Sequence, residues 1–107
     1  MSDGSRRERL PDRRARITES FDCMGQKFQA GAGFYNDGRL GEVFLNAGKS
    51  GTLSEILMRD MAICASIALQ YGADPMEIKK ALCHDDNGNA EGPLGVWLEI
   101  LEKEIRT

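Results

Sequence analysis

The stretch that most constrains the fold runs from Leu53 to Tyr71 (LSEILMRDMAICASIALQY). Its apolar spacing predicts a helix, and Gly72 is expected to end it because glycine is common just after a helix C-terminus. Its second half, Met61 to Leu69, contains no charged side chain, whereas a surface helix shows polar residues in every turn. We therefore expect this helix to be buried on most of its circumference, with the other elements packed around it.

The long helix is expected to present one principal apolar face to the core. The members of this face are Leu53, Ile56, Leu57, Met61, Cys64, Ile67, Ala68 and Tyr71. Ala62, Ala65 and Ala68 keep parts of the helix surface thin, which allows close approach of a strand or another helix. Cys64 stands in the apolar register, so we interpret it as a buried small hydrophobic residue rather than a nucleophile.

Three strand signals precede this helix. They lie at residues 14–21, 27–34 and 41–46. Asn36-Asp37-Gly38 tolerates positive φ between two apolar runs, which predicts a hairpin turn. The predicted fold class is α+β, a three-stranded antiparallel meander packed on a long buried helix and followed by two shorter helices. Gly31 and Gly33 share one strand face, and we interpret this flat strip as the place where the long helix packs.

Two shorter helices are expected after the long one, at about residues 75–83 and 93–105. The first begins clearly, with Asp74 as N-cap, Pro75 at the first helical position and Glu77 three residues after the cap. In the second, apolar residues recur at helical spacing, and Trp97 among them is interpreted as an anchor in the core or an interface.

Length and cysteine usage restrict the class of protein. The chain has 107 residues, enough for one domain with a usable core. Its three cysteines, Cys23, Cys64 and Cys83, are far apart and odd in number, which favours a reducing compartment and argues against a disulfide framework or a zinc site. No signal peptide or membrane span is recognisable, so a cytoplasmic location is expected.

No metal site is predicted around the single histidine. His84 is followed by Asp85 and Asp86, but the segment fails the calcium-loop template, because Cys83 stands at the first ligand position and Leu94 at the last. We interpret it as a polar loop with a histidine near a helix C-terminus.

The net charge of −3 is unevenly distributed. Residues 1–16 carry six arginines against three acidic residues, a net +3, and the remainder carries eight basic and fourteen acidic residues, a net −6. We expect residues 1–13 to be a flexible basic arm and residues 14–107 to be a single domain. As an alternative, the arm is a candidate for binding nucleic acid or an acidic partner. The arginines concerned are Arg6, Arg7, Arg9, Arg13 and Arg14.

The loop before the long helix is a candidate anion or nucleotide site, because free amides at a helix N-terminus bind anions. Its residues are Gly48, Lys49, Ser50, Gly51 and Thr52. The GKS sequence matches the end of a Walker A motif, but Val43 occupies the position of the required first glycine. The alternative is purely structural, with Thr52 or Ser50 as N-cap and Glu55 completing a capping box with Thr52.

Residues 14–83 resemble a known family. The run DGRLGEVFLNAGKSG, followed by LSEILMRDMAICASIALQYGADPMEIKKAL, resembles the TSCPD domain, which occurs at the C-terminus of adenosylcobalamin-dependent (class II) ribonucleotide reductases and as free-standing small proteins. The resemblance implies a role linked to ribonucleotide reduction. Where many members carry the cysteine-containing TSCPD signature, this chain has residues 90–95 (AEGPLG), so it departs from the pattern on which a metal or redox role would rest.

The resemblance also implies that catalysis resides elsewhere. Class II reductases resemble a large barrel with internal cysteines and a separate cobalamin pocket, an apparatus too large for 107 residues. We therefore expect no catalytic residues and no bound cofactor in this chain, with adenosylcobalamin present only through an associated reductase.

Three hypotheses for function follow. The first is an accessory module that binds a reductase or a nucleotide through the third strand, the loop at 48–52 and the long helix. The second is a nucleic-acid or protein-binding adaptor that uses the basic arm. The third is a homodimer formed through exposed faces of the sheet or the terminal helix.

Overall fold

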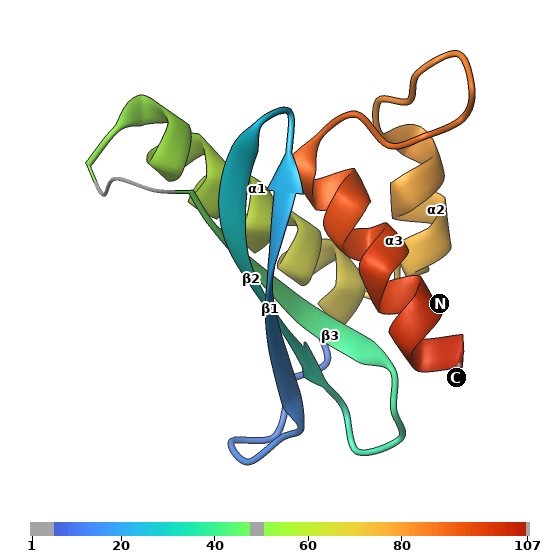
Figure 1. Ribbon diagram of the computed structural model, residues 1–107. Helices are drawn as coiled ribbons and strands as arrows, with labels where there is room; N and C mark the ends of the chain where they lie inside the picture. Colours follow the sequence, from blue (N-terminus) through green and yellow to red (C-terminus); the bar gives the residue numbers. More distant parts are fainter. Residues whose placement is uncertain (1–5, 48–50, 107) are drawn as a thin grey trace.

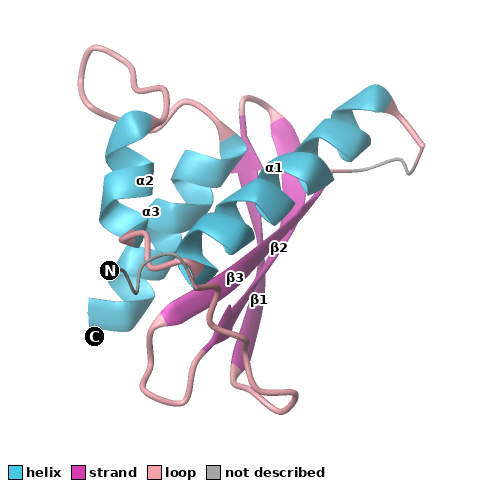
Figure 2. Ribbon diagram, turned by 180° about the vertical axis from the view of Figure 1, so that it is seen from behind, coloured by secondary structure: helices cyan, strands magenta, loops and turns pink. Residues whose placement is uncertain are grey.

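A computed structural model describes residues 6–47 and 51–106 of the chain. Its elements are β1 (Arg16–Cys23), β2 (Gln26–Phe34), β3 (Leu40–Asn46), α1 (Leu53–Gln70), α2 (Pro75–Ala81) and α3 (Pro93–Arg106). The strands form an antiparallel sheet in the order β1-β2-β3, and all three helices lie on one side of it (Figures 1 and 2). The predicted α+β class, a meander with a long helix against it and two shorter helices after it, is confirmed.

Two tight turns connect the strands. Met24 and Gly25, both at positive φ, join β1 to β2, and Gly38 at φ +92° lies in the turn between β2 and β3. In that second turn the Gly38 amide donates to the Tyr35 carbonyl over 2.9 Å. The hairpin predicted at Asn36-Asp37-Gly38 is therefore confirmed.

The predicted helix caps are also confirmed. Thr52 caps α1, since its Oγ1 accepts a hydrogen bond from the Glu55 amide at 3.2 Å. Asp74 caps α2 by accepting from the Met76 amide at 3.0 Å, and Pro75 takes the first helical position. Gly72, at φ +103°, turns the chain away after α1. Within the part of the chain that the structure describes, no helix is long and apolar enough to cross a membrane.

The core is centred on α3. Trp97 is fully buried, its ring stacks against Phe21 of β1, and its indole Nε1 donates to the Gly31 carbonyl at 2.9 Å. Leu98 and Leu101 are each 1% exposed. The interpretation of Trp97 as a core anchor is confirmed, and the last helix contributes the largest buried side chains.

The long helix α1 is buried along one narrow track, so the expectation of burial around most of its circumference was wrong. Ala62, Ala65 and Leu69 face the core. The predicted principal face points mostly outward: Leu53 is 71% exposed, and Cys64 is exposed as well. The reason is that small side chains let α1 lie close along β3, while α3 already fills the centre of the core.

The glycine strip of β2 faces away from the helices, which corrects its expected use. A Cβ atom on Gly31 would lie 3.2 Å from the Phe44 ring, and one on Gly33 would collide with the Glu42 carboxylate. Both neighbours are side chains of β3. The missing Cβ atoms therefore make room for cross-strand side chains on the open face of the sheet.

Candidate functional site

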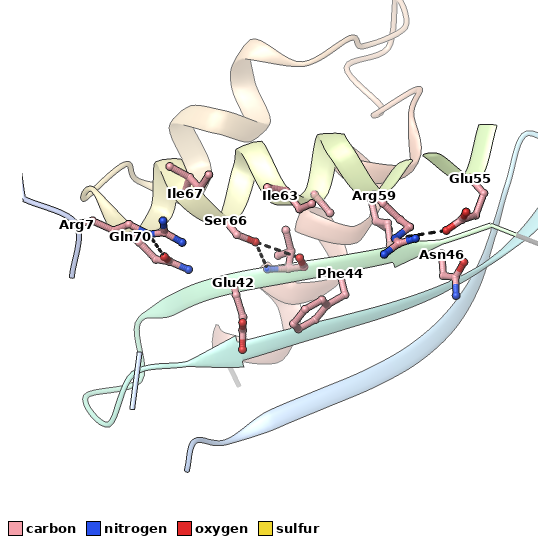
Figure 3. A pocket seen from close by; sticks show the side chains of 13 residues that line it. Arg7, Glu42, Phe44, Asn46, Glu55, Arg59, Ile63, Ser66, Ile67 and Gln70 are labelled. Atoms are coloured by element: carbon pink, nitrogen blue, oxygen red, sulfur yellow. Dashed lines mark hydrogen bonds and ion pairs between the residues drawn. The ribbon is translucent and has the colours of Figure 1, made fainter. Parts of the chain in front are cut away.

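A groove of about 870 Å³ runs between β3 and α1 (Figure 3). Ile63 and Ile67 line it on the helix side, which we call the helix rim. Phe44 and Asn46 line it on the strand side, which we call the strand rim. The full lining is Arg7, Glu42, Val43, Phe44, Leu45, Asn46, Glu55, Arg59, Ala62, Ile63, Ser66, Ile67 and Gln70.

Side chains of α1 close the free edge of the sheet at the bottom of this groove. Because β3 is the last strand, alternate backbone groups along it point away from β2. Ser66 Oγ accepts from the Val43 amide at 2.9 Å and donates to the Val43 carbonyl at 3.1 Å. Gln70 Nε2 donates to the Gly41 carbonyl at 3.0 Å. The helix therefore supplies hydrogen bonds that a fourth strand would otherwise make.

An ion pair between Glu55 and Arg59 neutralises one end of the groove. Glu55 is 5% exposed, and its carboxylate accepts from the Gly51 amide at 3.4 Å. The Arg59 guanidinium lies 3.5 Å from the same carboxylate, one helical turn along. This pair leaves the Glu55 end of the groove without an excess charge.

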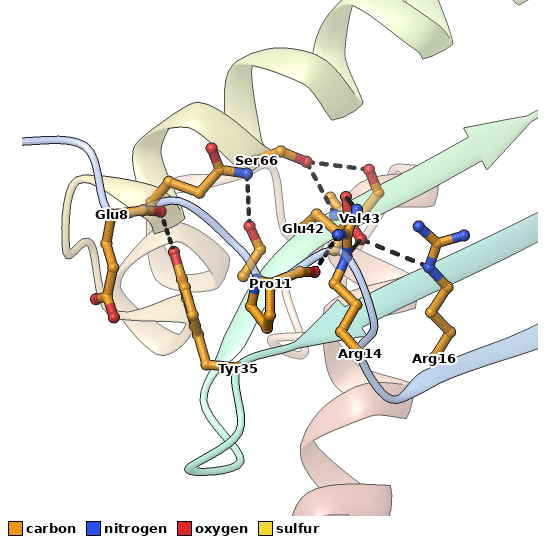
Figure 4. Close-up of polar contacts among 10 residues, drawn as sticks. Glu8, Pro11, Arg14, Arg16, Tyr35, Glu42, Val43 and Ser66 are labelled. Atoms are coloured by element: carbon orange, nitrogen blue, oxygen red, sulfur yellow. Dashed lines mark hydrogen bonds and ion pairs between the residues drawn. The ribbon is translucent and has the colours of Figure 1, made fainter.

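The other end of the groove is closed by the chain segment before β1. Arg7 Nε donates to Gln70 Oε1 at 2.6 Å, and the Glu8 amide donates to the Gln70 carbonyl at 2.8 Å. The Tyr35 hydroxyl donates to the Glu8 carbonyl at 2.7 Å (Figure 4). The described part of the predicted basic arm thus contacts the domain. The boundary between a flexible arm (residues 1–13) and a single domain (residues 14–107) stays a prediction.

Arg14 fastens this segment to the open face of the sheet. Its Nε lies 2.5 Å from Glu42 Oε2, and its Nη2 donates to Glu42 Oε1 at 3.2 Å. This hydrogen bond raises the pKa of Arg14. Arg16 lies 3.9 Å from the same carboxylate, so two guanidinium groups converge on Glu42 (Figure 4). The carboxylate occupies the space above Gly33.

The structure brings few of the predicted site residues together. Of the arm arginines, Arg7 lines the groove, Arg9 lines the pocket next to it and Arg14 binds Glu42, whereas Arg6 and Arg13 line neither pocket. Gly51 and Thr52 take part in the α1 cap. Gly48, Lys49 and Ser50 lie outside the described residues. The anion site at this loop therefore remains a prediction.

Sequence reasoning missed the residues that shape the groove. Ile63 and Gln70 were not assigned to any face, and Phe44 was placed only within a strand. Ser66 carried the one available signal, since a hydroxyl in an otherwise uncharged helical segment needs a hydrogen-bond partner.

Large apolar side chains remain exposed on and beside the helix rim. Leu57 and Ile63 are each 54% exposed, and Phe44 on the strand rim is 47% exposed. Leu53, Ile56 and Tyr71 extend this surface along the outer side of α1. We call these six residues the apolar surface of α1 and β3. Large apolar side chains left exposed beside a groove are candidates for contact with a partner.

The described residues contain no group of three or more His, Cys, Asp or Glu side chains that could hold a metal ion. No histidine lines the groove, and His84 pairs through its backbone with Ala90 in the loop between α2 and α3. Cys23, Cys64 and Cys83 are free, and burial raises the pKa of the Cys23 thiol.

Comparison with known families identifies the domain. The family model of the TSCPD domain matches residues 4–96. The chain belongs to the TSCPD domain family. This match confirms the resemblance seen over residues 14–83 and extends it to part of the segment before β1 and to the loop and first residues of α3.

The TSCPD domain of this chain is similar to parts of much longer proteins. It is 41% identical over 73 residues to a vitamin B12-dependent ribonucleotide reductase of Rhodopirellula baltica, a match that covers 68% of this chain and 7% of that protein. A protein of the same name from Bradyrhizobium diazoefficiens is 41% identical over 66 residues, covering 62% of this chain and 5% of the relative.

The same pattern holds for a third relative. The vitamin B12-dependent ribonucleotide reductase of Streptantibioticus cattleyicolor is 42% identical over 71 residues, covering 66% of this chain and 12% of that protein. The match thus spans a small fraction of each relative. No solved structure matches the chain significantly.

Proposed function

We propose that this TSCPD domain is an accessory module of ribonucleotide reduction that acts by binding a vitamin B12-dependent reductase and is not catalytic alone. The observation that carries the proposal is the apolar surface of α1 and β3 beside the groove. Burying such side chains is favourable, at roughly 25 cal/mol for each Å² removed from water.

The relatives support a reductase as the partner. In each of the three, the part similar to this chain is 5–12% of a protein named a vitamin B12-dependent ribonucleotide reductase. In those proteins the domain is therefore joined to a far longer chain. We propose that the same surface contacts a reductase here, and that the cobalamin cofactor belongs to that reductase in the cytoplasm.

The test is a binding measurement with a purified partner. The partner is a vitamin B12-dependent ribonucleotide reductase from the same organism, prepared without its own TSCPD segment. Titration calorimetry should detect binding to the wild-type chain. Ile63→Glu should weaken this binding by at least about tenfold, because the substitution places a charge in a contact from which water is excluded. Reductase activity measured with and without the module then tells whether binding alters turnover.

A matched control keeps this test specific. Met24 is 89% exposed in the β1–β2 turn and does not line the groove, so Met24→Glu adds the same charge elsewhere. It should leave binding unchanged. Absence of binding by the wild-type chain, or equal binding by all three proteins, would contradict the proposal.

The other hypotheses give different outcomes in parallel measurements. A nucleotide site at residues 48–52 predicts amide shifts in Gly51 and Thr52 when dATP is added, without any reductase. A nucleic-acid role of the arm predicts salt-sensitive binding of an oligonucleotide. A homodimer through the exposed faces of the sheet or the terminal helix predicts twice the mass of one chain in light scattering at high concentration.

A further inference from the structure

The shape of the groove suits an elongated occupant. Its lining on α1 extends from Glu55 to Gln70, which at 1.5 Å per residue is about 22 Å, the length of four helical turns. Ile63 and Phe44 stand exposed on opposite rims, so an occupant lying along the groove would cover both. The apolar contacts lie in the middle and the polar side chains toward the ends.

The backbone at the bottom of the groove is not available to an added strand. Strand addition uses the outward amides and carbonyls of an edge strand. Here both outward groups of Val43 bond to Ser66, and the Gly41 carbonyl bonds to Gln70. The next outward-facing residue, Leu45, is 3% exposed. An occupant must therefore satisfy its own backbone hydrogen bonds, as an α-helix does.

The two ends of the groove differ in charge. At one end Arg59 is paired with Glu55. At the other end Arg7 donates to the neutral Gln70 side chain, and it forms no ion pair within the described ranges. The adjoining pocket is lined by Arg7, Arg9, Leu10, Asp12, Arg14, Glu42 and Gln70. Because Arg14 and Glu42 neutralise each other, Arg7 and Arg9 together outweigh Asp12.

We propose that the groove binds an amphipathic helix of the partner, with its apolar side against Phe44, Ile63 and Ile67 and an acidic end at Arg7. This inference rests on the proposed function and adds the chemistry and polarity of the bound segment. Helices bound in apolar grooves are a recurring mode of recognition, and complementary charges fix their direction.

A second copy of this chain is a poorer occupant. Asp60 is exposed on the outer side of α1, between Leu57 and Ile63. Antiparallel pairing of α1 with its own copy would bring the two Asp60 carboxylates together at the centre. Like charges placed together disfavour such a contact.

The experiment selects the occupant from a library rather than assuming its sequence. A displayed library of about 20-residue helical peptides has leucine fixed at positions three and four apart and random residues in the first and last turns. Selection against the full chain should enrich Asp and Glu at one end only. Enrichment without an acidic bias, enrichment of basic ends, or no binder at all would overturn the proposal.

Variants then locate the selected peptide. Ile63→Glu should abolish its binding, and Arg7→Gln should weaken it by about tenfold at low salt and less at high salt, because screening reduces the charge contact. Arg13→Gln is the matched control, since Arg13 is exposed and lines none of the described pockets near the groove. If Arg7→Gln and Arg13→Gln lowered the affinity for the peptide equally, the basic segment would attract the peptide only through its overall charge. That result would overturn the placement of the acidic end at Arg7. Circular dichroism checks that each variant is folded.

Two further outcomes separate this inference from the proposed function. If Ile63→Glu and Arg7→Gln bound the reductase as tightly as the wild-type chain, the groove would not be the binding site, and the accessory role would remain. Peptide binding as expected, without reductase binding, would support the groove chemistry and remove the proposed partner. Direct binding of an oligonucleotide that is lost in Arg7→Gln and kept in Ile63→Glu, together with displacement of the peptide from the wild-type chain, would identify a phosphate site and overturn the inference.

Discussion

Glycine at position 33 has a steric role at the scale of single residues. The space that a Cβ would occupy is taken by the Glu42 carboxylate, which Arg14 and Arg16 hold against the strand. The Glu42 side chain is 10% exposed, so the pair is largely shielded from water. A buried carboxylate separated from its cations is costly, because it keeps the burial without the compensating charges.

We predict that Gly33→Ala lowers the free energy of unfolding by about 1–3 kcal/mol, since the new methyl group displaces Glu42 from Arg14. Urea denaturation measures this change. In a Glu42→Ala background the same substitution should cost far less, and the difference defines the coupling between the two positions. Gly92→Ala, where a Cβ would have no atom within 4 Å, is the control. Equal costs in both backgrounds would contradict the steric explanation.

Glu19 gives a prediction about pH. Burial raises its pKa, and so do the charge and hydrogen bond of Glu104. A carboxyl whose pKa is higher in the folded state favours folding when protonated, so its contribution is lost as the pH rises above its ordinary value of about 4.5. Glu19→Gln should therefore gain thermal stability relative to wild type as the pH is raised from acid to neutral. Melting curves at several pH values test this, with the exposed Glu91→Gln as reference.

At the scale of elements, the caps and turns could be predicted and the orientation of α1 could not. Thr52, Asp74 and Gly72 form hydrogen bonds with residues at most four positions away. Such contacts can be predicted from a short stretch of sequence. Which side of α1 faces inward depends on α3, some thirty residues later, because Trp97 competes for the same core. The apolar spacing of α1 predicts the helix itself, but most of the side chains that it assigns to the core are exposed.

Ser66 supports a prediction for the contact of α1 with the sheet. Ser66→Ala leaves the outward amide and carbonyl of Val43 without their partner, which should cost about 1–3 kcal/mol of unfolding free energy. Ser54→Ala makes the same chemical change on the exposed first turn of α1 and should be nearly neutral. Chemical denaturation compares the two. Similar effects at both positions would contradict a role of Ser66 at the strand edge.

At the scale of the whole molecule, stability is unevenly distributed. Helix α2 has seven residues, none of them fully buried, and Lys79 links it to α3 through a 2.8 Å ion pair with Glu102. Helix α3 and the sheet share the core. Elements with few buried contacts open locally without unfolding of the rest.

Amide hydrogen exchange should reflect this difference. We predict faster exchange in α2 than in the middle of α1 and α3, and a further increase in α2 alone for Lys79→Gln. Mass spectrometry of peptide fragments measures both effects. Lys103→Gln, at an exposed position of α3, serves as control. Uniform exchange in all three helices would contradict the prediction.

The groove itself could not be predicted because it combines distant parts of the chain. Arg7 and Gln70 are 63 positions apart, and Ser66 and Val43 are 23 apart. The sequence indicated the two elements that border the groove, the third strand and the long helix, since both carried the family pattern. It did not indicate that Phe44 and Ile63 would be left exposed on opposite rims.

The double hydrogen bond of Ser66 restricts how this position can vary in evolution. One side-chain atom must both accept and donate within a short reach of the backbone. Serine and threonine meet this requirement, whereas alanine lacks the group and asparagine separates donor from acceptor. Among TSCPD sequences that keep a helix along the last strand, substitutions at this position should therefore be confined to the two hydroxyl residues. A relative with a hydrophobic residue there must satisfy the amide and carbonyl at the position of Val43 in another way, through water or another chain segment.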